Sequence, residues 1–501
     1  MLGHSQATPA DQDARAEPAA PPQASPARRA GVVLRAHWLA AALLGVGLVL
    51  RVLAELAYRP ALFYIDSPRY LYDAQGMDPV GYKAPLRAIL AVGNLDTVTG
   101  VQHLLGLAMA LVIYLLLLRR GVSRWLAALA MAPVLLDAYQ LQSEQSIMPG
   151  TWFEALIVAG LAILLWRPGA GWRRLLAAGV LLGASATMAQ VGEALLLPAA
   201  GYVLVAVLAA AGGWRQAITK ALAMGAAFAL PIVAYMAGSD ALTGAFALSH
   251  TGVTSFYGRM AAAADCATLK LPAAERGLCP TRAQQAQGPD WLEYNAGSPV
   301  RAYYDSPDRA RTDGQLSSFN HAVLTQQPLR VLRAYGRDVL KLYAVTRTTD
   351  PGDTPVWRWW FRTYYRYFPP HAGQAQVDQA IQRWGGGKPA VWTPVASFLR
   401  AYQLDGGYTP GPLLALFTVT GLAGSLTLLR PRPPPLPPSL DPARRQRALA
   451  CLLFFASAAG LLLVSDMFEF SWRYQIPAVV TLVPAGVLGL SVLLSRRPSS
   501  A

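Results

Sequence analysis

Long apolar runs recur along the chain and are separated by short polar and basic stretches. Each run is close to the roughly 20 residues that a helix needs to cross a bilayer. Several runs contain no charged residue, which is hard to reconcile with the core of a soluble protein. We therefore predict about ten membrane-spanning helices, at residues 37–56, 100–118, 123–139, 151–166, 175–190, 194–212, 221–237, 411–429, 448–465 and 475–495.

Composition agrees with this pattern, because 54% of the 501 residues are hydrophobic and only 14% are charged. Soluble domains have about 25% charged residues. The net charge of +15 does not indicate nucleic-acid binding. The arginines lie mostly beside the apolar runs, and they form no basic patch interleaved with aromatic residues. We expect an all-α polytopic membrane protein in the cell membrane.

The basic residues also predict the orientation of the chain. They fall in alternate loops, between spans two and three, four and five, six and seven, and eight and nine, and after the last span. The short loops near 140–149 and 190–193 contain no Lys or Arg. The positive-inside rule then places both termini in the cytoplasm.

This orientation divides the chain into four parts. Residues 1–36 are an expected disordered cytoplasmic tail, and residues 37–237 an N-terminal membrane domain with a first outer loop at 57–99. Residues 238–409 are a large extracytoplasmic domain, for which we expect mixed structure. Residues 410–497 supply the last helices, with a Pro-rich cytoplasmic linker at 430–447.

The first outer loop, YIDSPRYLYDAQGMDPVGYKAPL, places acidic and basic side chains among tyrosines just beyond a span. A carboxylate at a membrane mouth can act as a general base, and nearby cations can hold a lipid-linked phosphate. A solvated interfacial helix with ordinary ion pairs would have the same composition. The charged residues are Asp66, Arg69, Asp73, Asp78, Lys83 and Arg87.

Two further segments contain candidate residues. Glu144, in the second outer loop, is either a second acid at the same site or a hydrated loop residue. Glu154 and Glu193 either face a cavity or are carboxylates at helix starts, where the helix dipole favours them. In FEFSWRYQIPAV, Arg473 and its neighbour Tyr474 lie at the outer mouth of the last span. Arg473 is either an aromatic-belt anchor or a cation for a lipid-linked phosphate.

The large outer segment contains FYGRMAAAADC and LCP, with Arg259, Cys266 and Cys279. Two cysteines that face an oxidising compartment are expected to form a disulfide. Cys451 lies in an apolar span and is expected to stay unpaired, and His250 reads as a surface residue. No Gly-rich phosphate loop, HExxH or GxSxG motif is present, and no cysteine spacing indicates zinc.

These features together resemble the GT-C glycosyltransferases, which use polyprenyl-phosphate sugars. The resemblance is to the protein-mannosyltransferase-like and aminoarabinose-transferase-like subgroup, in an actinobacterial branch. It implies that Asp66 of YIDSPRY is the catalytic base, and it leaves Glu144 or Glu154 as a substitute for the family's second-loop Asp. It also implies that Lys83 of YKAPL and Arg473 of RYQIP bind the donor phosphate.

The resemblance has departures. The family's first loop carries an Asp-Glu pair, whereas Ser67 follows Asp66 here, and the stretch MPGTWFE lacks the family's second-loop Asp. The YGR, DC and LCP segments look like loops of actinobacterial members. They add Arg259 to the substrate-binding candidates, which also include Arg69, Arg87 and Tyr474.

The function implied is an inverting glycosyltransferase. It would move a sugar from a polyprenyl-phosphate donor, within the membrane lipid, to an extracytoplasmic acceptor of the cell envelope. The sequence indicates no particular cofactor; some members of the superfamily use a divalent metal, and the sequence does not decide whether this chain does. The alternative is a non-enzymatic lipid-carrier transporter or flippase, or an envelope-assembly protein. Polar clusters at span ends favour the enzyme over a transporter, whose sites usually lie near the membrane midplane.

Overall fold

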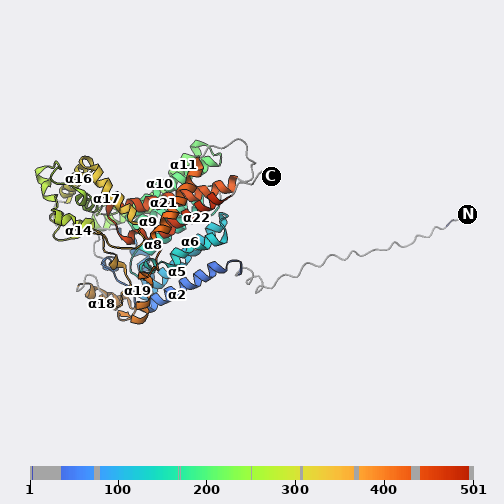
Figure 1. Ribbon diagram of the computed structural model, residues 1–501, viewed down its shortest axis with the longest axis horizontal. Coiled ribbons are helices and arrows are strands. Elements are labelled where there is room, and N and C mark those ends of the chain that lie inside the picture. The colour runs from blue at the N-terminus through green and yellow to red at the C-terminus, as the bar shows by residue number, and fades with distance from the viewer. Residues whose placement is uncertain are drawn as a thin grey trace.

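Each of the ten predicted spans contains a helix in the computed structural model, which describes Gly3 and residues 35–72, 79–167, 169, 171–249, 251–304, 309–365, 372–429 and 441–495. Figure 1 shows these helices gathered into one bundle. They are α2 (Trp38–Ala57), α5 (Leu95–Arg119), α6 (Arg124–Leu136), α8 (Gly150–Leu165), α9 (Trp172–Met188), α10 (Leu196–Ala209), α11 (Trp214–Thr243), α20 (Gly411–Leu426), α21 (Asp441–Phe468) and α22 (Ala478–Leu494).

Seven of the apolar helical stretches in the described residues are long enough to cross a membrane, where α10, α20 and α22 are each counted with the 3-10 turn beside them. Helices α6, α8 and α9 are shorter, with 13, 16 and 17 residues. The predicted span 123–139 divides in two, because the chain turns at Asp137 and continues as helix α7 (Ala138–Glu144). Asp137 begins α7 by accepting a hydrogen bond from the backbone N–H of Tyr139. At 1.5 Å per residue, α6 spans only about 20 Å.

The basic loops meet at one end of the bundle. The guanidinium of Arg120 donates to the carbonyl of Leu165, and Arg445 donates to the carbonyl of Ala209 over 3.1 Å. Arg447 lies near the carbonyl of Gly121, at 3.5 Å. The arginines used to predict orientation therefore satisfy carbonyls at helix ends, as expected from the helix dipole. That this end faces the cytoplasm stays a prediction. The tail before Arg35, apart from Gly3, and linker residues 430–440 lie outside the described residues.

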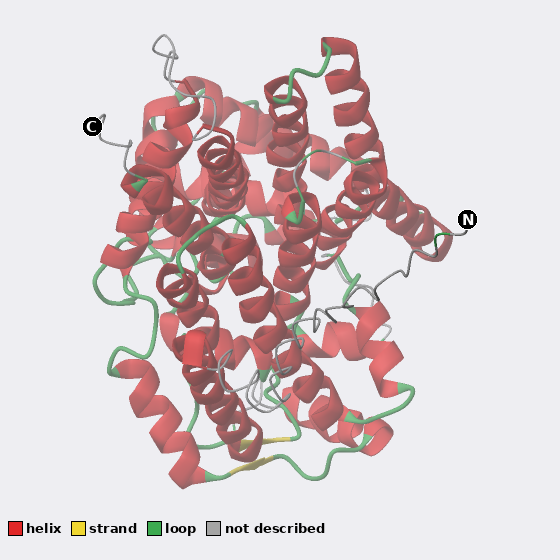
Figure 2. Ribbon diagram, turned by 90° about the vertical axis from the view of Figure 1, so that its right-hand side faces the viewer, coloured by secondary structure: helices red, strands yellow, loops and turns green. Residues whose placement is uncertain are grey.

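The first outer loop is joined to two other parts of the chain. Strand β1 (Tyr58–Arg59) pairs with β2 (Ala390–Val391) in an antiparallel arrangement, seen at the lower edge of Figure 2. The backbone N–H of Leu62 donates to the carbonyl of Gln145 over 2.9 Å. The loop then forms helices α3 (Ser67–Leu71) and α4 (Lys83–Leu90). Asp73 and Asp78 lie outside the described residues.

The large outer segment is helical apart from strand β2 and irregular loops, over its described residues. Its own core is formed around Tyr257, Leu292 and Phe319. The elements are α12 (Gly252–Ala263), η2 (Ala273–Leu278), α13 (Arg282–Gln285), α14 (Gly288–Tyr294), α15 (Arg301–Tyr304), α16 (Arg309–Gln326), α17 (Pro328–Lys341), η3 (Val356–Trp359), α18 (Ala372–Trp384) and α19 (Thr393–Leu404), where η marks a 3-10 helix. Two other 3-10 turns lead into spans, η1 (Gln190–Leu195) and η5 (Trp472–Gln475), and η4 (Thr427–Leu429) follows α20.

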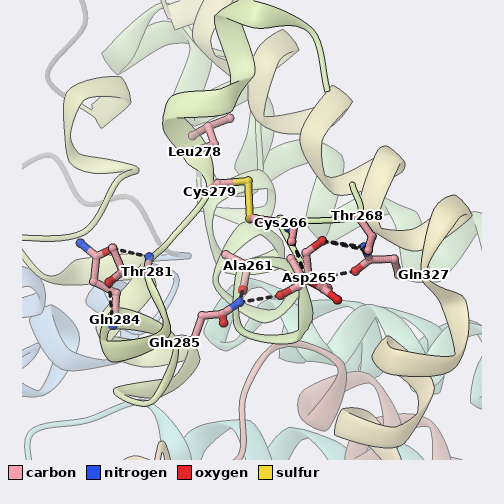
Figure 3. Close-up of a disulfide and its surroundings, with 12 residues drawn as sticks. Ala261, Asp265, Cys266, Thr268, Leu278, Cys279, Thr281, Gln284, Gln285 and Gln327 are labelled. Carbon is pink, nitrogen blue, oxygen red and sulfur yellow. Dashed lines mark hydrogen bonds between the residues drawn. A yellow bond between two sulfur atoms is a disulfide. The ribbon is translucent and has the colours of Figure 1, made fainter. Parts of the chain in front are cut away.

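The predicted disulfide is present. Cys266 and Cys279 are bonded, with their Cα atoms 5.9 Å apart, and Figure 3 shows the bond closing the loop after α12. Gln285 supports that loop by donating to the carbonyls of Ala261 and Ala264. Cys451 is buried and unpaired, as expected for a residue within a span.

Candidate functional site

Asp66, directly before α3, and Arg473, in the turn that leads into the last span, form an ion pair. The distance from Oδ2 of Asp66 to the guanidinium of Arg473 is 3.4 Å, and the two residues are 407 positions apart in the sequence. A second cation, Arg69, lies 3.8 Å from Oδ1 of Asp66. Both side chains of the pair are about one-fifth exposed. The carboxylate is therefore held by cations and still reachable by a ligand.

Three aromatic rings surround the Arg473 guanidinium. Its central carbon is 5.1 Å from the ring centre of Trp359, 5.6 Å from that of Tyr474 and 6.0 Å from that of Tyr64. Tyr64 and Trp359 are themselves stacked, with ring centres 4.2 Å apart. Rings near a cation restrict its movement and lower the local polarity. The guanidinium is thus pre-positioned for an anionic ligand.

The site is assembled from three distant segments. Tyr64 and Asp66 come from the first outer loop, Trp359 from η3 of the outer domain, and Arg473 from the turn that starts the last span. Asp66 immediately precedes α3, whose second residue is Pro68 and whose short length keeps Arg69 on the same turn. We refer to Tyr64, Asp66, Trp359, Arg473 and Tyr474 as the Asp66 cluster.

The structure places Glu144 in a different, buried cluster. Its carboxylate accepts from Arg51 at 2.8 Å and lies 2.9 Å from Nδ1 of His103. Nε2 of His103 contacts Gln145 at 2.7 Å, and Glu55 lies 3.8 Å from the same ring nitrogen. Among the described residues, no hydrogen bond or ion pair joins Glu144 to Asp66. Glu144 is fully buried, so its geometry fits a support for the bundle better than an acid at the Asp66 cluster.

The other candidate cations of the first loop are Arg87 and Lys83, both in α4. Arg87 donates to the carbonyl of Leu71 over 2.9 Å and lies 5.2 Å from the ring centre of Trp384. Lys83 begins α4, which is held to α3 by an edge-to-face contact of Tyr70 and Tyr82. The shared phosphate contact of Lys83 and Arg473 stays a prediction.

Arg259 lies outside the Asp66 cluster. It is buried, forms an ion pair with Asp338 and donates to the carbonyl of Asp466 over 3.0 Å. The Asp466 side chain accepts from Gln475, two residues after Arg473. Arg259 therefore supports the turn that carries Arg473. The geometry does not expose it to a substrate.

Two buried carboxylic acids, Glu293 and Glu469, lie in the region of Tyr474. Burial raises the pKa of Glu293 to about 7, and its carboxylate accepts from Ser255 at 2.5 Å. Burial also raises the pKa of Glu469 well above its ordinary value, and the nearby charges of Asp290 and Glu293 add to this. These carboxylic acids therefore retain protons at a pH where exposed ones lose them.

A divalent metal has no evident place in the described residues. No group of three His, Cys, Asp or Glu side chains among them is placed to hold one.

A small pocket of about 30 Å³ opens beside Tyr64. It is lined by Leu62, Phe63, Tyr64, Gln142, Ser146, Arg358, Trp360, Arg362 and Tyr365.

Several residues of these clusters were missed from sequence alone. Trp359 lies in the run WRWW, where repeated aromatics beside an arginine were an available signal. Arg51 and Glu55 lie inside the first apolar span, and ionisable residues within a span are a functional or structural signal in themselves. Glu293 and Glu469 had no such signal, because their burial depends on the fold.

The fold and the site define an all-α, multi-pass membrane protein with a charged, aromatic-lined cluster where its outer segments meet. No protein-family model and no curated protein matches the chain. Two solved structures are similar to parts of it. Both similarities are weak.

The first is the S. cerevisiae protein O-mannosyltransferase Pmt1-Pmt2 complex bound to the sugar donor, with 17% identity over 45% of this chain and 36% of that chain, and a TM-score of 0.33. The second is the oligosaccharyltransferase AglB from Archaeoglobus fulgidus, in complex with an inhibitory peptide and a dolichol-phosphate. It has 13% identity over 92% of this chain and 51% of that chain, and a TM-score of 0.39. The chain spans about half or less of the length of these structures. At such TM-scores neither similarity establishes a shared activity.

Proposed function

We propose that this protein is a glycosyltransferase that moves a sugar from a polyprenyl-phosphate donor to a hydroxyl of an extracytoplasmic acceptor. The observation that carries the proposal is the Asp66–Arg473 pair. A carboxylate suited to accept a proton and a guanidinium suited to bind a phosphate lie 3.4 Å apart at the mouth of the last span. Both groups are partly exposed, and a lipid-linked donor would reach them from the bilayer.

The reaction follows from these two groups. Asp66 would take the proton of the acceptor hydroxyl, and that oxygen would form a bond to the anomeric carbon. The bond from the anomeric carbon to the phosphate oxygen would break, and its electrons would stay on the phosphate. Arg473 would stabilise that negative charge as it develops, where electrostatic help counts most. Attack opposite to the leaving phosphate inverts the anomeric centre.

The test is sugar transfer by the purified full-length protein in nanodiscs, with a panel of polyprenyl-phosphate sugars and cell-envelope acceptors. Asp66→Asn should lower turnover about 100- to 10,000-fold, since that is the usual contribution of a general base. Donor affinity should stay close to wild type in this variant. Arg473→Ala should weaken donor binding as well as turnover.

The matched control is Asp405→Asn, which alters an exposed carboxylate at the end of α19. Its turnover should equal that of wild type. Near-normal transfer by Asp66→Asn would show that the base is another group. Transfer that is lost equally in Asp405→Asn would indicate a general effect on folding.

A lipid-carrier transporter is the second candidate, and the ionisable residues Arg51 and Glu55 inside the span α2 favour it. Ionisable side chains inside spans often mark a transport path. A transporter would move the labelled lipid across a liposome membrane with its sugar still attached. Such movement without transfer to any acceptor would replace the enzyme proposal.

A further inference from the structure

Helix α17 (Pro328–Lys341) presents its apolar side outward. Leu329, Leu332 and Leu340 are each more than 60% exposed. They lie on one stripe of the helix, because residues three and eleven positions apart are about one and three turns apart and fall on the same face. Gly336 lies on the same stripe, and a Cβ added there would meet nothing within 4 Å. A soluble amphipathic helix does the opposite and buries this face.

The side of α17 that faces the protein carries a buried charge. Asp338 is buried and forms ion pairs with Arg259 and with Lys341, the latter at 2.8 Å. Lys341 also pairs with Asp353. The orientation of the helix is therefore fixed by buried ion pairs, and its leucines remain outside. Breaking such a buried pair is costly, so the helix does not easily rotate to hide them.

The position of α17 relative to the spans indicates what covers the leucines. The hydroxyl of Tyr335 donates to the carbonyl of Leu463 over 3.0 Å. Leu463 lies in the span Pro442–Phe468, five residues before its outer end. At 1.5 Å per residue, this contact is about 8 Å inside that end. Figure 1 shows α17 where the outer helices meet the bundle.

The exposed cations of α17 lie beside the leucine stripe. Arg333 and Arg337 are exposed. Viewed down the helix axis, each lies less than a third of a turn from the leucine stripe. A helix with an apolar face and flanking basic residues lies in the membrane interface, with its apolar face about 5–10 Å deep. That depth agrees with the position of the Tyr335 contact.

We infer that α17 is an interfacial helix that binds the outer leaflet of the membrane. Its leucines enter the boundary between headgroups and acyl chains, and Arg333 and Arg337 bind the phosphates of anionic lipids. Hydrogen bonds connect α17 to the turn that carries Arg473. Arg259 donates to the side chain of Asp338 and to the carbonyl of Asp466, and Gln475 donates to the side chain of Asp466. This inference is independent of sugar transfer.

The experiment is spin labelling of the full-length protein in nanodiscs of phosphatidylcholine with about a quarter phosphatidylglycerol. A single cysteine replaces Leu332 or Gly336, and the control site is Ala274, an exposed residue of η2. The native cysteines do not interfere, because two are bonded and Cys451 is buried. Labels at 332 and 336 should be reached better by oxygen than by a water-soluble nickel chelate. The label at 274 should show the reverse.

Two results would overturn the inference. Free access of the nickel chelate to 332 and 336 would place α17 in water. Protection from both oxygen and nickel would mean that a protein covers the face. The headgroup contact is tested separately. In the wild-type sequence, the depth of the label should differ between nanodiscs of phosphatidylcholine alone and nanodiscs of the mixture. In the double variant Arg333→Gln/Arg337→Gln this change of label depth should be lost. Arg276→Gln, an exposed arginine of η2, should retain it, and a wild type without such a change would refute the headgroup contact.

Discussion

Arg51 of α2 and Glu144 of α7 form a fully buried ion pair, with 2.8 Å between guanidinium and carboxylate. The same guanidinium donates to the carbonyls of Val134 and Leu135, where α6 ends. The residues after Glu144 continue into the backbone bridge with Leu62, four residues before Asp66. The pair therefore ties three helices to the loop that carries the proposed base.

Glu144→Gln should destabilise the protein strongly. The change leaves the Arg51 charge buried without its carboxylate, which typically costs about 3–5 kcal/mol. The measurement is the melting temperature in nanodiscs. Asp405→Asn removes an exposed carboxylate and serves as the control, with an expected effect within about 0.5 kcal/mol. Equal melting temperatures for the two variants would contradict a structural role of the pair.

Gly106→Ala should also destabilise, by about 1–3 kcal/mol. A Cβ at this position of α5 would collide with the Glu144 carboxylate and with Arg51, and neither side chain is free to move because each holds the other. Gly45→Ala in α2 is the matched control, since its Cβ would meet nothing within 4 Å. This control should be neutral or slightly stabilising, as alanine favours helix. A neutral Gly106→Ala would mean that the ion pair has room to shift.

Stability should depend on pH through Glu293. Its folded pKa is about 7 because of burial, against an ordinary value of 4.5. Between these values the folded state binds more protons than the unfolded state, so the free energy of unfolding falls as the pH rises. Glu293→Gln removes this loss, which is roughly 3 kcal/mol at most.

The measurement for Glu293 is the melting temperature of wild type and Glu293→Gln from pH 4.5 to pH 7. The difference between them should grow in favour of the variant across that window and stay constant above it. Glu293 is one cause of the raised pKa of Glu469, so the variant also lowers that pKa, and this changes the difference in the same direction. Parallel curves for the two proteins would rule out a buried, protonated Glu293.

The orientation of the chain can be tested with two single cysteines. Ala274→Cys, in the outer domain, should react with a membrane-impermeant maleimide on intact cells. Arg215→Cys, in a basic loop at the start of α11, should react only after permeabilisation. Both residues are exposed, so permeabilised cells supply the control for reactivity. Reaction of Arg215→Cys in intact cells would reverse the predicted orientation.

The apolar pattern by itself predicted the positions of the spanning helices, because a bilayer requires continuous apolar length that can be read locally. It also indicated the disulfide, since only two cysteines lie in the polar outer segment. Asp66 and Arg473 were each identifiable as charged residues beside a span. The division of span 123–139 at Asp137 could not be identified from the sequence, because it is caused partly by a contact of Asp137 with Arg347, 210 residues away.

Only the tertiary structure decided which of these charges meet. Asp66 and Glu144 looked equivalent in sequence, as carboxylates in two outer loops, yet one faces Arg473 at the surface and the other is enclosed with Arg51. The outward leucines of α17 likewise have the spacing of an ordinary buried face. What separates these cases is burial and the partner that each side chain reaches. Both depend on how distant segments pack, which local sequence does not encode.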